Sequence, residues 1–451
     1  MSLPPQRRTT GLGGRGLRVL GVTVAATLRL GLPGLGVGPA AAEADSAPEC
    51  GGSHWVGSWA AAPSDWLGLA DPALVPQVSI ADQTYRIVVT PHLGGSTLRI
   101  HLTNRYRPLP LTIGAVTVGV QTSGAGVDPE SLRPVTFSGR TGATIAAGDD
   151  LVSDPIELPV QAWQRLAVSV HLPESALLPT EHFDGEATSY YALPGTGDHT
   201  ADAAPDTFAL RTTAVPLASG IDVQAPGAVS SLVALGDSIT DGYVASNVLG
   251  VPQDSAVVDT DSRYPDFLQR RLDAAGHTIS VLDLGISGNR VLAGGFIPQF
   301  GPSTLDRLDH DVLAQAGVTD VILLEGINDL GIPIGADYEQ LVAAYTTLIA
   351  RMKTAGLHVH LGTLTPAANA VTDGLSAPLA DGVRLRLNDW IRHQTLADSV
   401  IDFAAAVANP ADPSTLDPRF AGPDNLHPNP AGYQAMAEAV DLNVLHGSEC
   451  G

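Results

Sequence analysis

Five short apolar runs in the second half of the chain place the tightest limit on its fold. The runs are Leu232–Leu235, Ile279–Leu284, Asp320–Leu324, Leu357–Leu361 and Ser399–Phe403. Nearly continuous apolar composition is typical of parallel strands that are buried on both faces. Amphipathic segments with helical spacing lie between the runs, and a final helix is expected over 430–440. Strands that alternate with helices predict a doubly wound α/β domain with a parallel sheet, here over residues 228–447.

The first half of the chain has a different pattern, in which helical periodicity is hard to find. Short runs rich in Val, Ile, Thr and Leu are separated by turn-forming residues such as Gly94-Gly95 and Asp149-Asp150. This pattern predicts a β-sandwich or jelly-roll domain over residues 50–223, and we expect a linker over 218–227. Such an accessory domain could bind polysaccharide by stacking sugars on tryptophan, although burial in the core is the commoner use of this residue. The tryptophans concerned are Trp55, Trp59, Trp66 and Trp163.

Residues 1–42 have the features of a secretory signal peptide. Arginines precede a mostly apolar stretch over 19–35, and Ala40-Ala41-Ala42 offers a cleavage site with small side chains. Arg29 and Pro33 interrupt the apolar stretch, which argues against a spanning helix of about 20 apolar residues. Arg7-Arg8 leaves both the general and the twin-arginine export routes open. We therefore expect a secreted, extracellular protein whose mature chain has no transmembrane segment.

The chain is acidic, with 24 Lys and Arg residues against 47 Asp and Glu residues and a formal net charge of -23. Residues 1–42 contain five arginines and no acidic residue, so their removal would change this charge from -23 to -28. A protein with such a charge is repelled by polyanions. We therefore do not expect nucleic acid as a partner, and binding to an anionic membrane surface would be unfavourable.

Two cysteines, Cys50 and Cys450, lie near the two ends of the expected mature chain. In an exported protein an even pair of cysteines is most simply a disulfide, and the termini of compact proteins are often close together. Two free thiols, or a bridge between two molecules, are the alternatives. We expect an intramolecular bond between Cys50 and Cys450.

Loops with polar or glycine residues follow several of the predicted strands. Gly236-Asp237-Ser238 follows the first strand, Gly285–Asn289 the second and Gly326–Asp329 the third, while Asp424–His427 comes after the last strand and a further loop. The carboxyl ends of the strands in such a sheet meet where ligands bind. Found alone, each segment is as easily a turn, a cap or a surface loop. Together and in this order, they predict one shared site.

The residue types in these loops suit nucleophilic catalysis. The Ser238 hydroxyl needs a base to take its proton, and His427 is the residue type fitted to that role. Asp424 lies three residues before His427, where its carboxylate could orient the imidazole and stabilise the imidazolium. Negative charge on a substrate carbonyl oxygen would be met by the backbone N–H groups of Ser238 and Gly288 and by the Asn328 amide. A glycine at 288 would let the backbone approach the substrate closely.

The ordered set resembles the sequence blocks of the SGNH (GDSL-type) serine hydrolases, which are Gly-Asp-Ser, an isolated glycine, Gly-x-Asn-Asp and Asp-x-x-His. The likeness extends from Ser231 to about Leu445, and His54–Trp59 resembles a segment that opens secreted relatives with an added N-terminal β domain. The resemblance implies a flavodoxin-like SGNH domain, an esterase or lipase activity, and no cofactor. The nucleophile elbow of the α/β-hydrolases is not matched, because Thr240 stands in place of its second glycine.

A metal site is the rival interpretation of His358 and His360. Two residues apart on one predicted strand, the two imidazoles would share a face and could begin such a site. No third ligand is indicated, so we expect ordinary strand histidines and no metal.

The substrate remains open among lipid acyl esters, short-chain acyl esters and acetylated polysaccharide. Two loops, Tyr243–Ser262 and Gly294–Pro302, are expected to wall the acyl pocket, and their Val, Leu and Phe residues favour an apolar acyl group over acetate. A function of another class is a glycan-binding protein whose hydrolase domain is inert. All the sequence blocks are intact, which favours the enzyme.

Overall fold

The computed structural model describes residues 50–64, 79–174, 176–295, 297–331, 335–371, 375 and 378–450. The predicted signal peptide over 1–42 and Trp66 lie outside the described residues. The described residues belong to one compact unit, Asp45–Gly451. Within them, no helix combines the length and the apolar composition that crossing a membrane requires.

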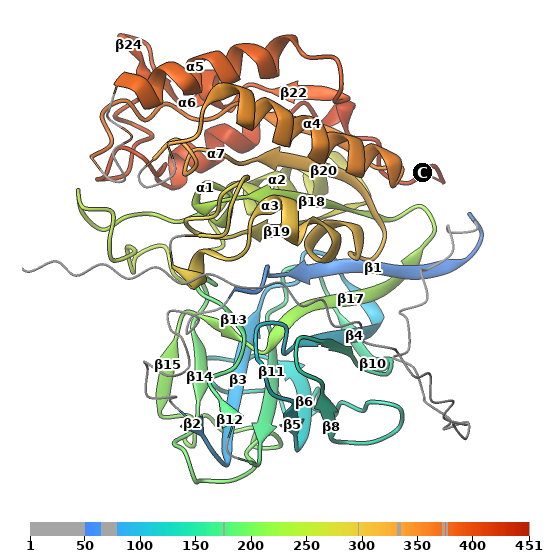
Figure 1. Ribbon diagram of the computed structural model, residues 1–451. Helices are drawn as coiled ribbons and strands as arrows, with labels where there is room; N and C mark the ends of the chain where they lie inside the picture. Colours follow the sequence, from blue (N-terminus) through green and yellow to red (C-terminus); the bar gives the residue numbers. More distant parts are fainter. Residues whose placement is uncertain are drawn as a thin grey trace, which may run out of the picture. The chain divides into compact units, whose positions relative to one another are not determined.

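A five-stranded parallel sheet forms the centre of the second half of the chain, and its strand order is β19–β18–β20–β21–β22 (Figure 1). The strands are β18 (Ser230–Gly236), β19 (Ile279–Gly285), β20 (Val318–Leu324), β21 (His358–Gly362) and β22 (Ser399–Ile401). All four pairings are parallel. The predicted parallel sheet is therefore confirmed. The strand order reverses beside β18, which is the position at which open α/β sheets bind ligands.

Helices between these strands bury the sheet in one apolar core. The main helices are α2 (Tyr264–Ala275), α4 (Tyr338–Thr354), α5 (Pro378–His393) and α7 (Pro430–Glu438). Shorter helical segments are α1 (Ser238–Asp241), α3 (Thr304–Leu308), η2 (Asp309–Leu313), α6 (Phe403–Val407), η1 (Pro298–Phe300) and η4 (Leu442–Val444). Helix α2 lies beside α7, and α4 lies beside α5. Leu235 and Leu323 of the sheet share this core with Tyr264 of α2 and Tyr345 of α4. A small antiparallel pair, β23 (Ala408–Asn409) and β24 (Asp412–Leu416), follows α6.

The first half of the chain, called here the β-rich half, contains two larger antiparallel sheets (Figure 1). The first sheet consists of β1 (Ser53–Ala60), β17 (Ala218–Pro226), β4 (Gly95–Thr103), β10 (Ile156–Val160) and β9 (Asp150–Val152). The second consists of β15 (Leu210–Thr212), β14 (Ser189–Tyr191), β3 (Gln83–Val89), β11 (Leu166–Leu172), β6 (Ala115–Val120) and β7 (Arg133–Pro134). Leu98 of β4 and Ile221 of β17 lie in one buried cluster with Ile87 of β3 and Val168 of β11. Side chains of both sheets thus form a common core.

Three short antiparallel pairs complete the β-rich half. They are β2 (Ser79–Ile80) with β12 (Ala176–Leu177), β5 (Leu111–Ile113) with β8 (Ala143–Ile145), and β13 (Glu181–His182) with β16 (Val215–Pro216).

The prediction of a linker over 218–227 is wrong. Residues Ala218–Pro226 form strand β17, which pairs with β1 on one side and with β4 on the other. This strand also extends past the expected boundary at 223. Its partners lie more than 100 residues earlier in the chain, so the local composition, with one Pro-Gly pair, gave no sign of them.

The β-rich half and the second half, called here the α/β half, meet along β1 (Figure 1). Strand β1 lies against β19, and the Gly57 N–H donates to the Ala316 carbonyl at 2.9 Å. Polar side chains also cross this junction. The pairs are His92 with Asp266, His182 with Asp241, Arg105 with Asp311, Trp163 with Asp273 and Arg165 with Asp261.

The predicted disulfide bond is present and joins Cys50 to Cys450 across a sequence separation of 400 residues. A loop of this length lowers the entropy of the unfolded chain, and the loop-entropy model gives an upper limit of about 5 to 6 kcal/mol for its contribution to stability. The bond therefore ties the start of the β-rich half to the end of the α/β half.

Arg307 lies buried beneath the carboxyl ends of the central strands. Its Nη2 donates to the Gly236 carbonyl of β18 at 2.8 Å, and its Nη1 donates to the Leu284 carbonyl of β19 at 2.8 Å. Its Nε donates to the Asn289 side chain at 2.9 Å, and Asp311 accepts from Nη1 at 3.1 Å. One side chain thus holds the ends of two neighbouring strands and the loop that follows β19.

We predict that Arg307→Met lowers the free energy of unfolding by about 3 to 5 kcal/mol. The substitution removes the hydrogen bonds that Arg307 donates to Asp311 and to two carbonyl oxygens, and these acceptors stay buried. Denaturant unfolding measures this change. Arg351→Met is the control, since Arg351 is one-third exposed and pairs with Asp309 at the surface, where such pairs contribute about 1 kcal/mol or less. Similar losses in the two variants would contradict the role given to Arg307.

Candidate active site

Ser238 opens helix α1 immediately after strand β18. Asp237 caps this helix, and its Oδ1 accepts from the Ile239 N–H at 2.9 Å. Gly242 ends the helix in the left-handed conformation, with φ 82°. The short capped helix fixes the Ser238 hydroxyl at the carboxyl end of the strand.

Ser238, His427 and Asp424 form a continuous chain of hydrogen bonds. His427 Nε2 lies 2.8 Å from Ser238 Oγ, and His427 Nδ1 lies 2.6 Å from Asp424 Oδ2. The other carboxylate oxygen of Asp424 accepts from the backbone N–H groups of Leu426 and His427, both at 3.1 Å. Burial raises the pKa of Asp424, but the hydrogen bond and the charge of His427 outweigh it and lower the pKa below its usual value. An ionised Asp424 can therefore orient the imidazole so that Nε2 accepts the serine proton.

The loop that carries His427 is held by further contacts. The His427 carbonyl accepts from the Gly422 N–H at 2.8 Å, and the Tyr243 ring packs on the imidazole with 4.9 Å between ring centroids. Tyr433 of α7 donates to the Tyr243 carbonyl at 2.6 Å. His427 is thus fixed from the loop after α1 and from helix α7.

Gly288 occupies a position that only glycine fits. Its φ is +77°, and a Cβ there would lie 2.4 Å from the ring of Phe300. Asn328, in the loop after β20, donates from Nδ2 to the Asn289 carbonyl at 2.9 Å, and Arg290 Nε donates to the Asn328 carbonyl at 3.0 Å. The loops after β19 and β20 are therefore joined. Asn328 keeps a second amide hydrogen that a substrate oxygen could accept.

Asp329 strengthens the same connection. Its two carboxylate oxygens accept from the backbone N–H groups of Val291 and Leu292, at 2.8 and 3.0 Å. Ser238 thus lies at the start of α1, and the other four predicted site residues lie on the expected loops. The structure links Ser238, His427 and Asp424 directly by hydrogen bonds, and it links the loops of Gly288 and Asn328 through Asn289.

The sequence analysis missed Asp241, which contacts the Gly288 loop, and His182, which contacts Asp241. Asp241, at the end of α1, accepts from the Ser287 N–H and from Ser287 Oγ, both at 3.1 Å. His182, on β13 of the β-rich half, lies 3.1 Å from the other oxygen of Asp241. Asp241 could have been found, because it lies one helical turn after Ser238. Nothing in the sequence around His182 indicates this contact.

Buried carboxyl groups surround the site, and burial is the main cause of their shifted pKa values. Burial raises the pKa of Asp237 to about 7 and that of Asp329 to about 6. Burial also raises the pKa of Asp283 to about 7. For Asp184, burial and then the charge of Asp241 raise the pKa to about 6. These groups take up protons more readily in the folded protein than in the unfolded chain.

His358 and His360 have structural partners. His360 lies between Asp320, at 3.0 Å, and Ser399, at 2.7 Å, while the His358 ring stacks on His446 with 3.5 Å between centroids. Among the described residues, no group of three or more His, Cys, Asp or Glu side chains is arranged to hold a metal ion.

The tryptophans proposed to stack on sugars contact protein groups. Trp163 donates to Asp273 at 2.9 Å and lies under the Arg270 guanidinium. The Arg99 guanidinium covers the Trp55 ring at 4.6 Å, and Trp59 packs partly buried against the core of the β-rich half. These contacts favour structural roles.

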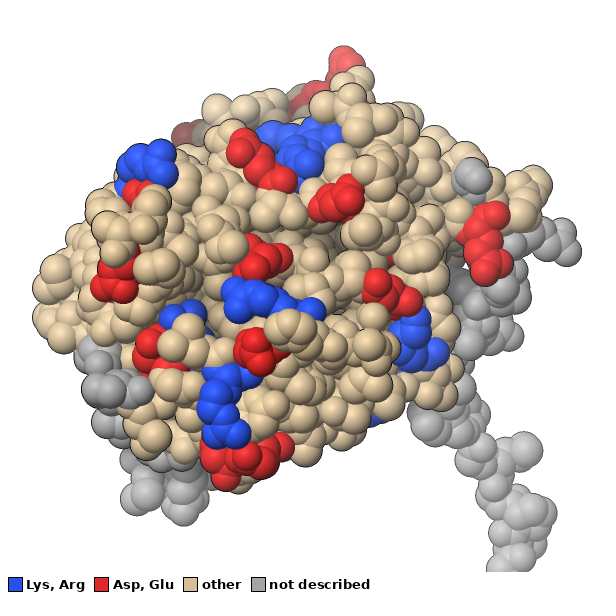
Figure 2. All heavy atoms as spheres, turned by 90° about the horizontal axis from the view of Figure 1, so that it is seen from above, with Lys and Arg blue, Asp and Glu red and all other residues tan. Residues whose placement is uncertain are grey.

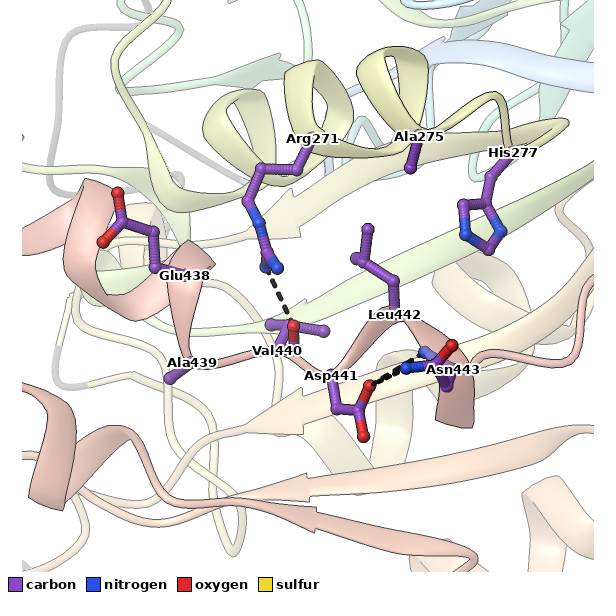
Figure 3. A pocket seen from close by; sticks show the side chains of 9 residues that line it. All are labelled: Arg271, Ala275, His277, Glu438, Ala439, Val440, Asp441, Leu442 and Asn443. Atoms are coloured by element: carbon purple, nitrogen blue, oxygen red, sulfur yellow. Dashed lines mark hydrogen bonds between the residues drawn. The ribbon is translucent and has the colours of Figure 1, made fainter.

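A pocket of about 460 Å³ lies away from this site, between α2 and the segment that follows α7 (Figure 3). Arg271 reaches across it and donates to the Val440 carbonyl at 2.8 Å, and Asp441 bonds to Asn443 (Figure 3). None of the predicted catalytic residues lines this pocket. The hydrogen-bonded chain at Ser238 therefore remains the best candidate for the active site.

Residues 234–435 match the model of the GDSL-like lipase/acylhydrolase family. The match covers most of the α/β half. The resemblance seen in the sequence is confirmed, and the GDSL-like domain makes the protein a serine esterase of the SGNH type.

Solved structures that are similar to the chain include three esterases. A family two carbohydrate esterase from Clostridium thermocellum, in complex with cellohexaose, is 15% identical, with 80% of this chain and 91% of that chain covered and a TM-score of 0.34. An aryl esterase from M. smegmatis is 16% identical, covering 47% and 96%, with a TM-score of 0.36. A carbohydrate acetylesterase from Sinorhizobium meliloti is 14% identical, covering 47% and 95%, with a TM-score of 0.36. At these TM-scores the likeness decides nothing about substrate. No match was found among the curated proteins.

We predict that the protein is more stable at pH 5 than at pH 8. A carboxyl group whose pKa is raised on folding stabilises the folded state below its unfolded pKa, and this contribution is lost as the pH rises through its folded value of about 6 to 7. Denaturant unfolding at the two pH values measures the difference, and Asp283→Asn should make it smaller. Stability that is equal at both values, or higher at pH 8, would contradict this account of the buried carboxyl groups.

Proposed function

We propose that this protein is a secreted carboxylic ester hydrolase that acts through Ser238, His427 and Asp424 and an acyl-enzyme intermediate. The observation that carries the proposal is the hydrogen-bond chain from Ser238 Oγ through His427 to Asp424. In the proposed organisation, residues 1–42 are the signal peptide, 50–223 form a β-sandwich accessory domain and 228–447 form the SGNH domain.

In the proposed first step, Ser238 Oγ attacks the carbonyl carbon of the ester while His427 Nε2 takes its proton. The resulting imidazolium is stabilised by the Asp424 carboxylate at Nδ1. The tetrahedral intermediate then collapses, and the alcohol leaves with the proton from His427. The acyl group remains on Ser238.

In the second step, His427 takes a proton from water, which attacks the acyl carbonyl. The acid is released, and Ser238 regains its proton. In both steps, negative charge on the carbonyl oxygen would be stabilised by the N–H groups of Ser238 and Gly288 and the Asn328 amide. A donor of this kind contributes about 3 to 4 kcal/mol to lowering the barrier.

Secretion is supported by the leader-like composition of residues 1–42 and by the Cys50–Cys450 disulfide. Disulfides persist in oxidising compartments and are rare in the cytosol. On the face seen in Figure 2, basic and acidic side chains are interspersed. This distribution, with the acidic net charge, gives a nucleic acid no basic patch to bind on that face.

The loop after the nucleophile favours an apolar ester. Val248, Leu249 and Val251 are 58%, 72% and 66% exposed on this loop, and the Tyr243 hydroxyl donates to the Gly250 carbonyl at 2.8 Å. The same Tyr243 packs on His427, so the exposed apolar side chains belong to a loop that adjoins the base. We therefore propose lipid or short-chain acyl esters as substrates, with a polysaccharide deacetylase as the alternative.

We predict that Ser238→Ala lowers kcat on a p-nitrophenyl ester by a factor of about 10³ or more, because no nucleophile remains. The assay uses purified protein with p-nitrophenyl esters of increasing chain length and with acetylated xylan. A higher kcat/KM on the longer chains is expected, whereas preference for acetylated xylan would select the deacetylase. Equal rates for the wild type and Ser238→Ala would overturn the catalytic assignment. Binding of xylan without turnover would support the glycan-binding alternative.

A further inference from the structure

One buried histidine of the β-rich half reaches the candidate active site. His182 is 4% exposed, and its Nε2 lies 3.1 Å from Asp241 Oδ1 while its Nδ1 lies 3.0 Å from the Ala62 carbonyl. Both partner atoms are acceptors, so both ring nitrogens donate when the two bonds form. Burial lowers the pKa of His182, but the charge of Asp241 and the two hydrogen bonds raise it to about 9. His182 is therefore an imidazolium at neutral pH.

Asp241 passes this contact on to the loop that carries Gly288. Its second oxygen accepts from both the N–H and the hydroxyl of Ser287, the residue before Gly288. On its other side, the same loop is held by Asp329, which binds the N–H groups of Val291 and Leu292. The loop is thus fixed at Ser287, at Val291 and Leu292, and at Asn289 through Asn328, and the contact at Ser287 depends on a residue of the β-rich half.

The charges explain why Asp241 needs His182. Burial and then the charge of Asp241 raise the pKa of Asp184, also from the β-rich half, while its hydrogen bond to Ser287 and the charge of His182 act in the opposite direction. Without the imidazolium, Asp241 would be a buried carboxylate that faces another acid, and Ser287 would be its one remaining hydrogen-bond partner among the described residues. Loss of one partner of a buried ion pair leaves an uncompensated charge. Asp241 would then move, and its hold on Ser287 would weaken.

We propose that His182 is a positioning residue of the esterase site, which acts through Asp241 and Ser287 to hold the Gly288 N–H where it meets the substrate carbonyl oxygen. The inference rests on the proposed function. It also gives the β-rich half a part in catalysis, because this half supplies one end of the contact chain. A donor displaced by a fraction of an ångström loses much of its effect on the barrier.

His92 provides a matched control. It is 5% exposed and also crosses the junction, with Nδ1 2.7 Å from the Val281 carbonyl and Nε2 3.2 Å from Asp266. Asp266, however, holds Arg263 at the start of α2. The two histidines therefore share burial and bonding but differ in whether their carboxylate binds the Gly288 loop.

The test compares kcat, KM and Tm for His182→Asn, His182→Gln and His92→Asn on a p-nitrophenyl ester that the wild type hydrolyses. His182→Asn is too short to reach Asp241, so its kcat should fall about tenfold or more, with KM within about threefold of the wild type. His182→Gln can place an amide near the position of Nε2 but carries no charge, so its kcat should fall less than that of His182→Asn. His92→Asn should lower Tm but leave kcat within about twofold.

Several outcomes would overturn the inference. The first is that His182→Asn keeps the wild-type kcat while Ser238→Ala is inactive. The second is that kcat falls equally in His182→Asn and His92→Asn. If His182→Asn does not fold, Ser287→Ala replaces it, because this substitution leaves His182 and Asp241 in place and removes the Ser287 hydroxyl, which bonds to Asp241 and to Asp184. Its kcat should fall about threefold, and an unchanged value would overturn the inference. Equal rates for the wild type and Ser238→Ala would instead overturn the proposed function, and this inference with it.

Discussion

The site depends on one buried cation, Arg307, that holds the carboxyl ends of neighbouring strands together. Parallel strands bring their ends to one edge of a sheet, but the loops that follow them are free to diverge unless something binds them. Arg307 donates to the carbonyl of Gly236, the last residue of β18, and to the carbonyl of Leu284, the residue before the end of β19. It also donates to the side chain of Asn289 in the loop that follows β19. The segment that carries Ser238 and the loop that carries Gly288 therefore start from fixed positions.

A second layer of contacts joins these loops to one another and to the β-rich half. Asn328 and Asp329 tie the loop after β20 to the loop after β19, and Asp241 ties the latter to the end of α1. Many of these contacts are made by buried carboxylates, and burial raises the pKa values of several of these groups. Such groups cost stability at neutral pH. Their position around Ser238 is consistent with sites that keep polar groups for function at the expense of stability.

Local patterns were enough to predict the elements that make most of their contacts within the α/β half. The apolar run at Leu232–Leu235 predicted the centre of β18, and the short blocks around Ser238 and His427 predicted the residues that the structure joins by hydrogen bonds. The linker expected over 218–227 failed because β17 is defined by its pairing with β1 and β4, which composition does not report. His182 and Arg307 were missed for the same reason: their partners are distant in sequence, and a lone histidine or arginine carries no pattern. The domain limits and the export signal stay predictions.

The most direct test of the central claim is covalent labelling of the purified protein with a fluorophosphonate, followed by mass spectrometry of its peptides. Such reagents form a bond with a serine only where a base activates it. The account predicts one adduct, on Ser238, with ester turnover lost in proportion to the labelled fraction and no adduct in His427→Ala. Labelling of a different residue, or turnover that persists after Ser238 is fully labelled, would contradict it.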